Sequence, residues 1–522
     1  MAYDKSTTIG EIFRLSAKVL NENDVFTMGK RKLAKVFLRE LLDLNPTAND
    51  VELESTYKAC SWRKNIPADS ESFWNFVEKE YLDLEVEPKT KFTELAIRVN
   101  EDLIALAENL SYIKKELDSL EQKKKNGGRL TADERYYRNQ LEYFGKKNLV
   151  AKDEIVDFMT HKIKQHAIDK ASVQRVPFVS IGLSLFGDSP YAFGRRSRWV
   201  LADPYDVRSL DEYSNKFMDL PVSSYRELVK ECKSSPEKFK EYATAYIKGA
   251  PGEFPSVREK LADLVQKSHI LFDRKQVIET MLRHFEEKDY ISFVSMAPLQ
   301  IEGIFADICR EIGVSETQLD ISSLNDKLQH IDERMRSFFF FEYYSFKFPV
   351  LRNQVAHGGL VDGEFEDTAL HLMLDLLPVC GLTVSEDLPV MHALEILKEA
   401  SNGNNKKLME WVDLRKSVVI PDFYAVQETI SKTEAHYTFQ GFWDYLEGEL
   451  KKLRNEDQIN NSEPIKVAGK LRSSGIAADQ AERFLKSYRR VAADAIKQRN
   501  ETTEKLNNLL KPKDANFGGN AE

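Results

Sequence analysis

Three polar side chains with complementary chemistry lie within one short stretch of the chain: Arg352, Asn353 and His357. Histidine titrates near neutral pH, so His357 can donate or accept a proton during a reaction. Arginine stays charged and presents a planar fork that matches a phosphate group, and an asparagine can orient an imidazole or a phosphate oxygen. Together these groups suit phosphodiester cleavage in which a substrate hydroxyl is the nucleophile and no metal ion is needed.

The neighbouring residues predict a short helix with its own start and stop. Pro349 is tolerated in a first helical turn, where its missing N–H costs nothing. Gly358 and Gly359 predict the end of the helix, because glycine adopts the left-handed conformation after the last turn without a steric penalty. We therefore expect a helix over residues 349–357, or the first turns of a longer one.

This predicted helix brings the three polar groups to one broad surface. Asn353 and His357 are four residues apart and share a face, whereas Arg352 lies roughly 140° around the helix from His357. All three can therefore border the same concave surface. The alternative interpretation is that Arg352 stabilises a helix end and that His357 is an ordinary surface residue.

The segment Arg352-Asn-Gln-Val-Ala-His-Gly358 resembles the Arg-Asn-x-x-x-His signature of the HEPN (higher eukaryotes and prokaryotes nucleotide-binding) superfamily. With its trailing glycine, it is similar to the subfamily of unknown function that an Arg-Asn-x-x-x-His-Gly motif defines. The resemblance covers about a fifth of the chain, roughly residues 281–382. It implies a HEPN-like helical bundle at about 275–385 and a metal-independent endoribonuclease. The attacking group would be the RNA 2′-hydroxyl.

The resemblance also implies a role for each residue of the motif. His357 would be the general acid or base, Arg352 would hold the phosphate and stabilise developing charge, and Asn353 would orient either group. HEPN nucleases usually act as homodimers, and one motif carries one histidine whereas acid and base roles call for two groups. Phage defence, toxin–antitoxin action or stress response would be the setting, with an antitoxin or a defence-system protein as a further partner.

Two other residues are auxiliary candidates. Glu302 lies inside the apolar run Leu299–Ile308, where an unpaired buried carboxylate would be costly, so it faces water, a partner or a site. His371 lies on the helix predicted after the motif. An exposed edge for Glu302 and an unremarkable packing position for His371 are the alternatives.

Residues 176–201 interrupt the helical pattern and predict a minor β segment. The loop within this region ends in Arg195, Arg196 and Arg198, which could contact RNA through cationic and ring interactions. We favour the alternative, in which this loop is a linker that covers a helical domain.

Composition limits the protein class. The 522 residues are 42% hydrophobic and 30% charged, and the net charge is −9. This acidic balance argues against a general nucleic-acid coat protein, because such binding needs many phosphate contacts. The four cysteines lack metal-ligand spacing, the N-terminus lacks a signal pattern, and no apolar run approaches a membrane span. We expect a cytoplasmic protein with no cofactor and no metal.

Helical periodicity dominates the remainder, so the fold class expected is mostly α and multidomain. The expected regions are an N-terminal helical region (1–90), a coiled-coil hairpin (91–170), a mixed linker and helical region (171–274), the HEPN-like bundle (275–385), a C-terminal helical region (386–510) and a disordered tail (511–522). The hairpin is predicted from heptad-spaced apolar residues: Val99, Leu103, Leu106, Leu110, Ile113, Leu117 and Leu120.

Three features of the bundle region carry further expectations. Pro298 predicts a break or kink in the helix that contains Glu302, and Pro378 predicts the end of the helix that contains His371. The aromatic run Phe338–Phe348 predicts apolar area beyond what one small bundle can bury, which favours self-association.

Two other functions compete with the nuclease. One is a non-catalytic helical scaffold or sensor that binds a nucleotide, RNA or a protein partner. The other is a toxin half that a nucleotidyltransferase modifies. Such toxins often carry a tyrosine shortly after the histidine, and residues 358–363 contain none.

Overall fold

The computed structural model confirms that the protein is mostly α-helical. It describes residue 3 and residues 7–61, 63, 65–173, 189–195, 203–250, 252–356, 365–453 and 456–510. Within these ranges no strand forms, and the extended pairings are two isolated bridges, Leu84 with Ser172 and Ala250 with Phe254. Most of the β segment predicted at 176–201 lies outside the described residues. Its described part, 189–195, forms turns and a 3-10 helix over Phe193–Arg195.

The chain divides into two compact units, Met1–Ser214 and Asn215–Glu522. Their boundary falls inside the region for which the sequence predicts a mixed linker. The first unit contains α1 (Ile9–Glu22), α2 (Val25–Met28), α3 (Lys30–Leu42), α4 (Asp50–Cys60), α5 (Ser70–Leu82), α6 (Pro88–Lys125), α7 (Ala132–Asp157) and α8 (Ile163–Ala171), and a π-helical turn (Phe158–Lys162) joins α7 to α8.

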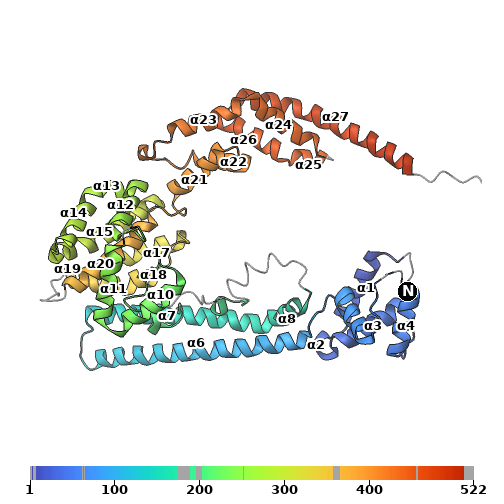
Figure 1. Ribbon diagram of the computed structural model, residues 1–522, viewed down its shortest axis with the longest axis horizontal. Coiled ribbons are helices and arrows are strands. Elements are labelled where there is room, and N and C mark those ends of the chain that lie inside the picture. Colours follow the sequence, from blue (N-terminus) through green and yellow to red (C-terminus); the bar gives the residue numbers. More distant parts are fainter. Residues whose placement is uncertain are drawn as a thin grey trace, which may run out of the picture. The chain divides into compact units, whose positions relative to one another are not determined.

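A long antiparallel hairpin, α6 and α7, is the main feature of the first unit (Figure 1). Thr131 begins α7 with a capping box that Glu134 completes. Three of the seven predicted seam residues of α6, Val99, Leu106 and Ile113, are buried, and Leu117 and Leu120 are only half-buried. Asp102 and Asn109 are buried in place of Leu103 and Leu110, which are only half-buried.

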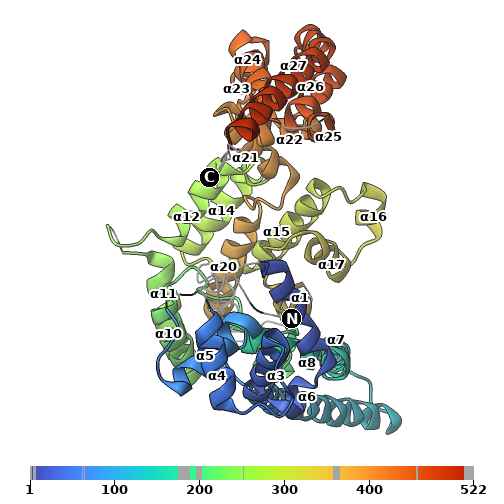
Figure 2. The same cartoon turned by 90° about the vertical axis from the view of Figure 1, so that its right-hand side faces the viewer.

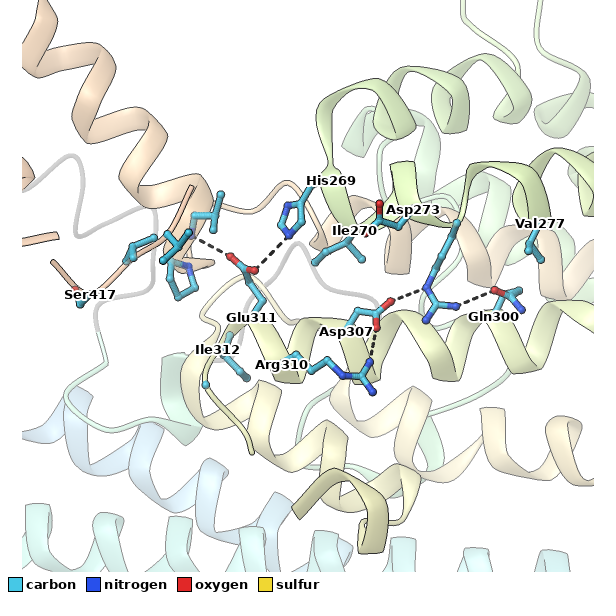
Figure 3. A pocket seen from close by; sticks show the side chains of 16 residues that line it. His269, Ile270, Asp273, Val277, Gln300, Asp307, Arg310, Glu311, Ile312 and Ser417 are labelled. Carbon is cyan, nitrogen blue, oxygen red and sulfur yellow. Dashed lines mark hydrogen bonds and ion pairs between the residues drawn. The ribbon is translucent and has the colours of Figure 1, made fainter. Parts of the chain in front are cut away.

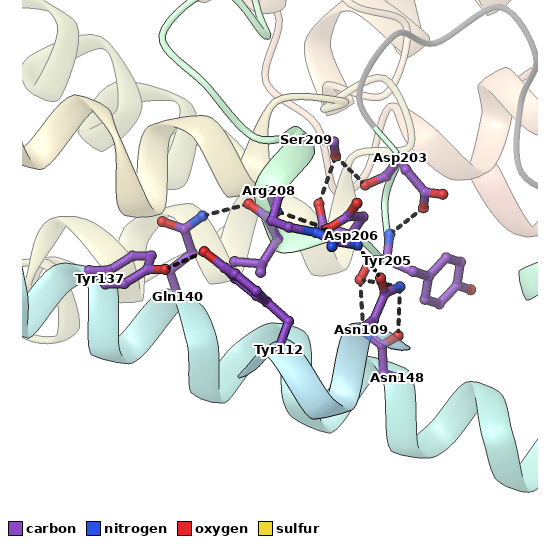
Figure 4. Close-up of polar contacts among 11 residues, drawn as sticks. Asn109, Tyr112, Tyr137, Gln140, Asn148, Asp203, Tyr205, Asp206, Arg208 and Ser209 are labelled. Atoms are coloured by element: carbon purple, nitrogen blue, oxygen red, sulfur yellow. Dashed lines mark hydrogen bonds and ion pairs between the residues drawn. The ribbon is translucent and has the colours of Figure 1, made fainter. Parts of the chain in front are cut away.

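The buried polar positions of the hairpin have partners in the segment 189–210. The amide nitrogens of Asn109 and Asn148 both donate to the Tyr205 carbonyl oxygen, at 3.3 and 2.8 Å (Figure 4). Gln140 Nε2 donates to the Val207 carbonyl at 3.3 Å. Because a covering segment supplies these hydrogen bonds, polar residues can occupy seam positions that heptad reasoning assigns to leucine.

The second unit begins with a helical bundle, followed by a C-terminal group of helices (Figures 1 and 2). The bundle contains α10 (Val222–Ser234), α11 (Pro236–Lys248), α12 (Val257–Lys267), α13 (His269–Asp273), α14 (Lys275–Glu286), α15 (Tyr290–Glu311), α16 (Glu316–Ile321), α17 (Leu324–Arg334), α18 (Phe341–Phe346), α19 (Phe348–Ala356) and α20 (Phe365–Leu382). Helix α15 contacts α14, α17, α19 and α20, so it is the central element of this bundle.

Neither proline of the bundle ends its helix. The predicted helix end at Pro378 was therefore wrong, and α15 is not broken at Pro298. Helix α15 continues through Pro298, and α20 continues through Pro378. Each proline removes one helical hydrogen bond, at a cost of about 3 kcal/mol. These two helices pack along each other and bury long apolar stripes, and this tertiary burial outweighs the local penalty.

Most of the aromatic side chains of the run Phe338–Phe348 are buried inside the bundle. Phe338, Tyr343, Tyr344, Phe346 and Phe348 are buried within the chain. Phe339, by contrast, is 74% exposed. Most of the expected apolar surplus is therefore buried within the chain, while Phe340 and Phe341 are half-buried. Self-association stays a prediction.

Helix α15 is also long and apolar enough to cross a membrane by length and composition, and among the described residues it is the one such helix. Its most apolar stretch is 44% buried inside the bundle. The core helix of a soluble protein meets the same criterion, so this is weak evidence for a membrane span.

The C-terminal helices form their own core. They are α21 (Pro389–Ser401), α22 (Asn405–Leu414), α23 (Gln427–Thr438), α24 (Gln440–Lys451), α25 (Glu456–Asn460), α26 (Glu463–Ser474) and α27 (Ala478–Leu510). Trp411, Tyr437, Phe442 and Trp443 are among the buried rings at its centre. The predicted tail, 511–522, lies outside the described residues.

Candidate functional site

Helix α19 carries the Arg352-Asn353 pair, and aromatic packing fixes where this helix begins. Phe348 and Tyr344 are both fully buried, with ring centroids 5.7 Å apart, and Tyr344 in turn contacts Phe305 of α15 at 5.1 Å. Arg352 follows Phe348 by four residues, and Glu302 precedes Phe305 by three, so each polar residue shares a helix face with its aromatic neighbour. The aromatic contact therefore brings Arg352 toward Glu302.

Arg352 and Glu302 form an ion pair at the surface between α15 and α19. Arg352 Nη2 donates to Glu302 Oε2 at 2.9 Å, and its Nη1 donates to Asn353 Oδ1 at 3.3 Å. The other carboxylate oxygen of Glu302 lies 3.5 Å from Lys327 Nζ of α17. The side chains of Arg352, Glu302 and Lys327 are 34%, 20% and 12% exposed, so the group is partly desolvated but still reachable.

This cluster has spare capacity for an anion. One carboxylate lies between two cations, which leaves an excess of one positive charge. Arginine has five N–H donors, and the bonds to Glu302 and Asn353 use one on each of Nη2 and Nη1 of Arg352, whose side chain stays 34% exposed. A negatively charged oxygen that bound here would meet a preformed, partly water-excluded pair of cations.

Lys327 is the member of the cluster that the sequence reasoning missed. It lies on the stripe of α17 that Leu324, Leu328 and Ile331 form, and the last two of these are fully buried. Cys309 of α15 also donates its thiol to the Lys327 carbonyl at 3.4 Å, which holds the two helices together. A lysine on an apolar helix face needs a carboxylate nearby, and that signal could have linked it to Glu302.

The structure does not describe every residue of the predicted site. His357, Arg196 and Arg198 lie outside the described residues. Arg195 is described, and its guanidinium is engaged locally: Nε donates to the Ser189 carbonyl at 2.9 Å and Nη2 to the Pro190 carbonyl at 3.4 Å. These bonds close a turn within residues 189–195.

His371 occupies a packing position on α20. Its ring stacks on Phe239 of α11, with centroids 4.1 Å apart and planes 23° apart. Burial, together with the positive charge of Lys216, lowers the pKa of His371 to about 3. The ring is therefore neutral near pH 7 and is a poor proton donor there.

A larger cavity, of about 990 Å³, lies along a different face of α15. Gln300, Asp307 and Glu311 line it, and they lie roughly 140–180° around the helix from Glu302. Figure 3 shows Arg274 and Arg310 paired with Asp307, and Glu311 beside His269. Arg274 Nε donates to Asp307 at 2.6 Å, and its guanidinium fits over Gly303, where a Cβ atom would come within 2.7 Å of Nη1.

The far end of this cavity joins the bundle to the C-terminal helices. Glu311 accepts from the backbone N–H of Val390 at 3.1 Å, and its other oxygen lies 3.5 Å from His269 Nε2. His269 Nδ1 in turn contacts the Tyr424 hydroxyl at 3.1 Å. Because these groups are committed to one another, we interpret this cavity as a polar joint, and we assign the candidate functional site to the Arg352 cluster.

Comparisons with known proteins found no match to this chain. No family model, no curated protein and no solved structure matches it. Among the described residues, moreover, no three His, Cys, Asp or Glu side chains come together as a metal site would require. The geometry of the Arg352 cluster and the Arg352–His357 motif are therefore the features that indicate a function.

Proposed function

We propose that the protein is a metal-independent endoribonuclease of the HEPN type, acting as a cytoplasmic homodimer on RNA. His357 is the general acid or base, Arg352 binds the scissile phosphate, and Asn353 orients one of them. The observation that supports this most directly is the Arg352–Glu302–Lys327 cluster. It presents excess positive charge at the end of α19, in the helical turn that leads to His357.

Within this proposal Glu302 and Lys327 are positioning residues. The carboxylate holds the guanidinium against α15 before substrate arrives, which reduces the ordering that binding would otherwise cost. The second cation keeps the site attractive to a phosphate despite that carboxylate. The setting proposed is phage defence, toxin–antitoxin action or a stress response, with an antitoxin or defence-system protein as the controlling partner.

The experiment is a cleavage assay on single-stranded RNA in the presence of EDTA. It compares the wild type with His357→Ala and Arg352→Ala. Gln354→Ala is the matched control, because Gln354 is exposed on the same helix between the two residues. We expect His357→Ala to slow cleavage by about 10²–10⁴-fold, the usual contribution of general acid–base catalysis. The control should cleave like the wild type.

The products identify the mechanism. We expect 2′,3′-cyclic phosphate and 5′-hydroxyl ends, and a 2′-deoxy substitution at the cut site should block the reaction. Wild-type activity in both alanine variants would overturn the assignment. So would a strict magnesium requirement with 5′-phosphate products. In cells, expression of the wild type but not of His357→Ala should impair growth and total RNA integrity.

One observation favours a second function, a non-catalytic scaffold or sensor. Arg352 is already paired with Glu302, so the same geometry is complete as a structural ion pair. RNA or nucleotide binding that is weakened by Arg352→Ala, without any cleavage by the wild type, would support this alternative.

A further inference from the structure

A second cavity in the bundle, of about 320 Å³, has the size of a small-molecule site. Its walls are mainly apolar and come from the start of the second unit, from α12 and from α20: Phe217, Leu264, Leu374, Leu377, Pro378 and Gly381. Phe217 is held at a φ of 58°, which is strained for a residue with a bulky side chain. Such strain persists only where the surroundings impose it.

Asn215 gives this cavity a buried acceptor that lacks a donor. The residue is 2% exposed and lines the cavity. Its Nδ2 donates to Asp375 Oδ1 at 2.9 Å and to the Tyr344 hydroxyl at 3.1 Å. A carboxylate can only accept, so the orientation of the amide is fixed, and Oδ1 remains without a partner among the described residues. A buried acceptor in this state is costly unless something donates to it.

Helix α20 provides a second acceptor on the same wall. Pro378 lies inside α20 and has no N–H, so it cannot donate to the carbonyl of Leu374 one turn earlier. Both residues line the cavity. Asn215 Oδ1 therefore lacks a donor among the described residues, and the Leu374 carbonyl lacks the N–H that a residue other than proline would offer at position 378.

The polar residues that the structure describes at the rim of the cavity leave no free cation that could bind an anion. Lys260 Nζ donates to Asp219 at 2.7 Å and to the Tyr246 hydroxyl at 3.1 Å, and Tyr246 donates to Asp219 at 2.5 Å. Burial alone would raise the pKa of Asp219, but hydrogen bonds from Lys260 and Tyr246 outweigh it and lower that pKa. The Asp219 carboxylate is therefore charged and already holds the cation of the rim.

We propose that this cavity binds a small, mainly apolar molecule that carries an N–H donor, such as an aromatic amine, in a neutral or cationic form. Its ring fills the space between Phe217 and α20, and its donor reaches the oxygens that Asn215 and Leu374 present. Phosphorylated and carboxylated molecules are excluded, because the cation of the rim is committed. This proposal is independent of the nuclease assignment, since it uses none of the residues of the Arg352 cluster.

Gly381 allows the cavity to be filled from inside. It lies in α20, and a Cβ atom built on it would meet open space. Gly381→Leu should therefore occupy the cavity while improving helix propensity. Gly381→Ala is the small control. Gly448→Leu is the matched control, because Gly448 is a helical glycine of α24 that also faces open space.

The test is calorimetric titration of the full-length chain with tryptamine, and with indole-3-acetate as the probe of the same ring with the opposite charge. We expect saturable binding of tryptamine to the wild type and to both controls, and binding at least about tenfold weaker in Gly381→Leu. Indole-3-acetate should bind at least about tenfold more weakly than tryptamine to the wild type.

Three outcomes would overturn the proposal: no tryptamine binding to the wild type, equal binding of both probes, or unchanged binding in Gly381→Leu. Thermal melting establishes that each variant is folded. Should Gly381→Leu fail to fold, Leu264→Trp blocks the same cavity from α12, and the same expectations apply to it.

Discussion

Two charged centres of the second unit use the same chemistry in different surroundings. Lys216 and Asp375 form an ion pair whose two side chains are both fully buried. Asp375 also accepts from Asn215 and, at 3.1 Å, from the Tyr343 hydroxyl. In the Arg352–Glu302–Lys327 cluster every member keeps some exposure.

The difference separates a structural role from a functional one. A buried pair is tolerated only when further hydrogen bonds compensate the loss of water, and Asp375 has them. The Asp375 carboxylate accepts from Lys216, Asn215 and Tyr343, so its oxygens are used inside the protein. The Arg352 cluster has fewer internal hydrogen bonds and carries an excess of positive charge. A site that binds a phosphate needs both properties.

The largest expected effect on stability comes from a variant that disrupts the buried Lys216–Asp375 pair. Asp375→Ala leaves the Lys216 ammonium buried without its partner, so we expect a loss of about 3–5 kcal/mol in the free energy of unfolding. Urea denaturation measures it. The double variant Lys216→Met, Asp375→Leu should recover most of the loss, because a matched apolar pair avoids the desolvation cost. A single variant as stable as the wild type would show that this centre does not support the bundle.

A second prediction concerns pH, because burial of His371 and, to a smaller extent, the positive charge of Lys216 disfavour its protonated form. The pKa of His371 is lowered to about 3 in the folded state, against about 6.5 in an unfolded chain. The unfolded state therefore binds more protons between these values, so stability is complete above pH 6.5 and falls as the pH decreases toward 3.

His371→Phe should remove this part of the pH dependence. The wild type should lose up to a few kcal/mol across that window, less than the full pKa difference implies because the ring keeps some exposure. Denaturation at pH 7 and pH 5 compares the two proteins. Parallel losses in both would assign the acid sensitivity to other groups.

A smaller effect on stability is expected at the exposed centre. Glu302→Gln should change the free energy of unfolding by about 1 kcal/mol or less, because the ion pairs it removes are partly solvated. If the nuclease proposal is correct, RNA cleavage should nevertheless fall by about tenfold, since Arg352 loses the group that positions it. Glu316→Gln, which removes an exposed partner of Arg310, is the control. A large loss of stability with intact cleavage would reverse the two roles.

The smallest predicted effect is a change in salt dependence. If Arg352 and Lys327 each contact an RNA phosphate, replacing either by alanine should reduce the slope of log affinity against log salt by about 0.7. Fluorescence anisotropy between 50 and 200 mM KCl measures it with a catalytically inactive His357→Ala background. Identical slopes would mean that the cluster does not meet the RNA backbone.

Local pattern was sufficient for much of this fold and for part of its site. The short helix that carries Arg352 begins beside Pro349, as predicted, because helix-start chemistry acts over a few residues. The continuity of α15 and α20 through their prolines could not be predicted in this way. It depends on burial between helices far apart in the sequence.

The contacts between Arg352, Glu302 and Lys327 could not be predicted from local sequence pattern either. Glu302 was a candidate because a carboxylate in an apolar run needs an explanation, yet its pairing with Arg352 joins residues fifty positions apart. Lys327 depends on the packing of a third helix, which no spacing in the sequence encodes. The polar seam positions Asp102 and Asn109 were missed because their partners come from the distant residues 191 and 205.

The polar seam positions fix how α6 pairs with α7, and they do so independently of how long the hairpin is. The hydrogen bonds of Asn109, Asn148 and Gln140 fix the pairing of the two helices against the segment that covers them. Beyond Gln140, Tyr137 contacts Tyr112 and Glu116 of α6 at 3.2 and 3.3 Å, and the two helices continue from there to the turn near Gly127. Removing or adding one heptad in both helices there would change the arm by about 10 Å while the seam keeps its register. The length of the hairpin can therefore change without changing the contacts that pair its two helices near Asn109 and Asn148.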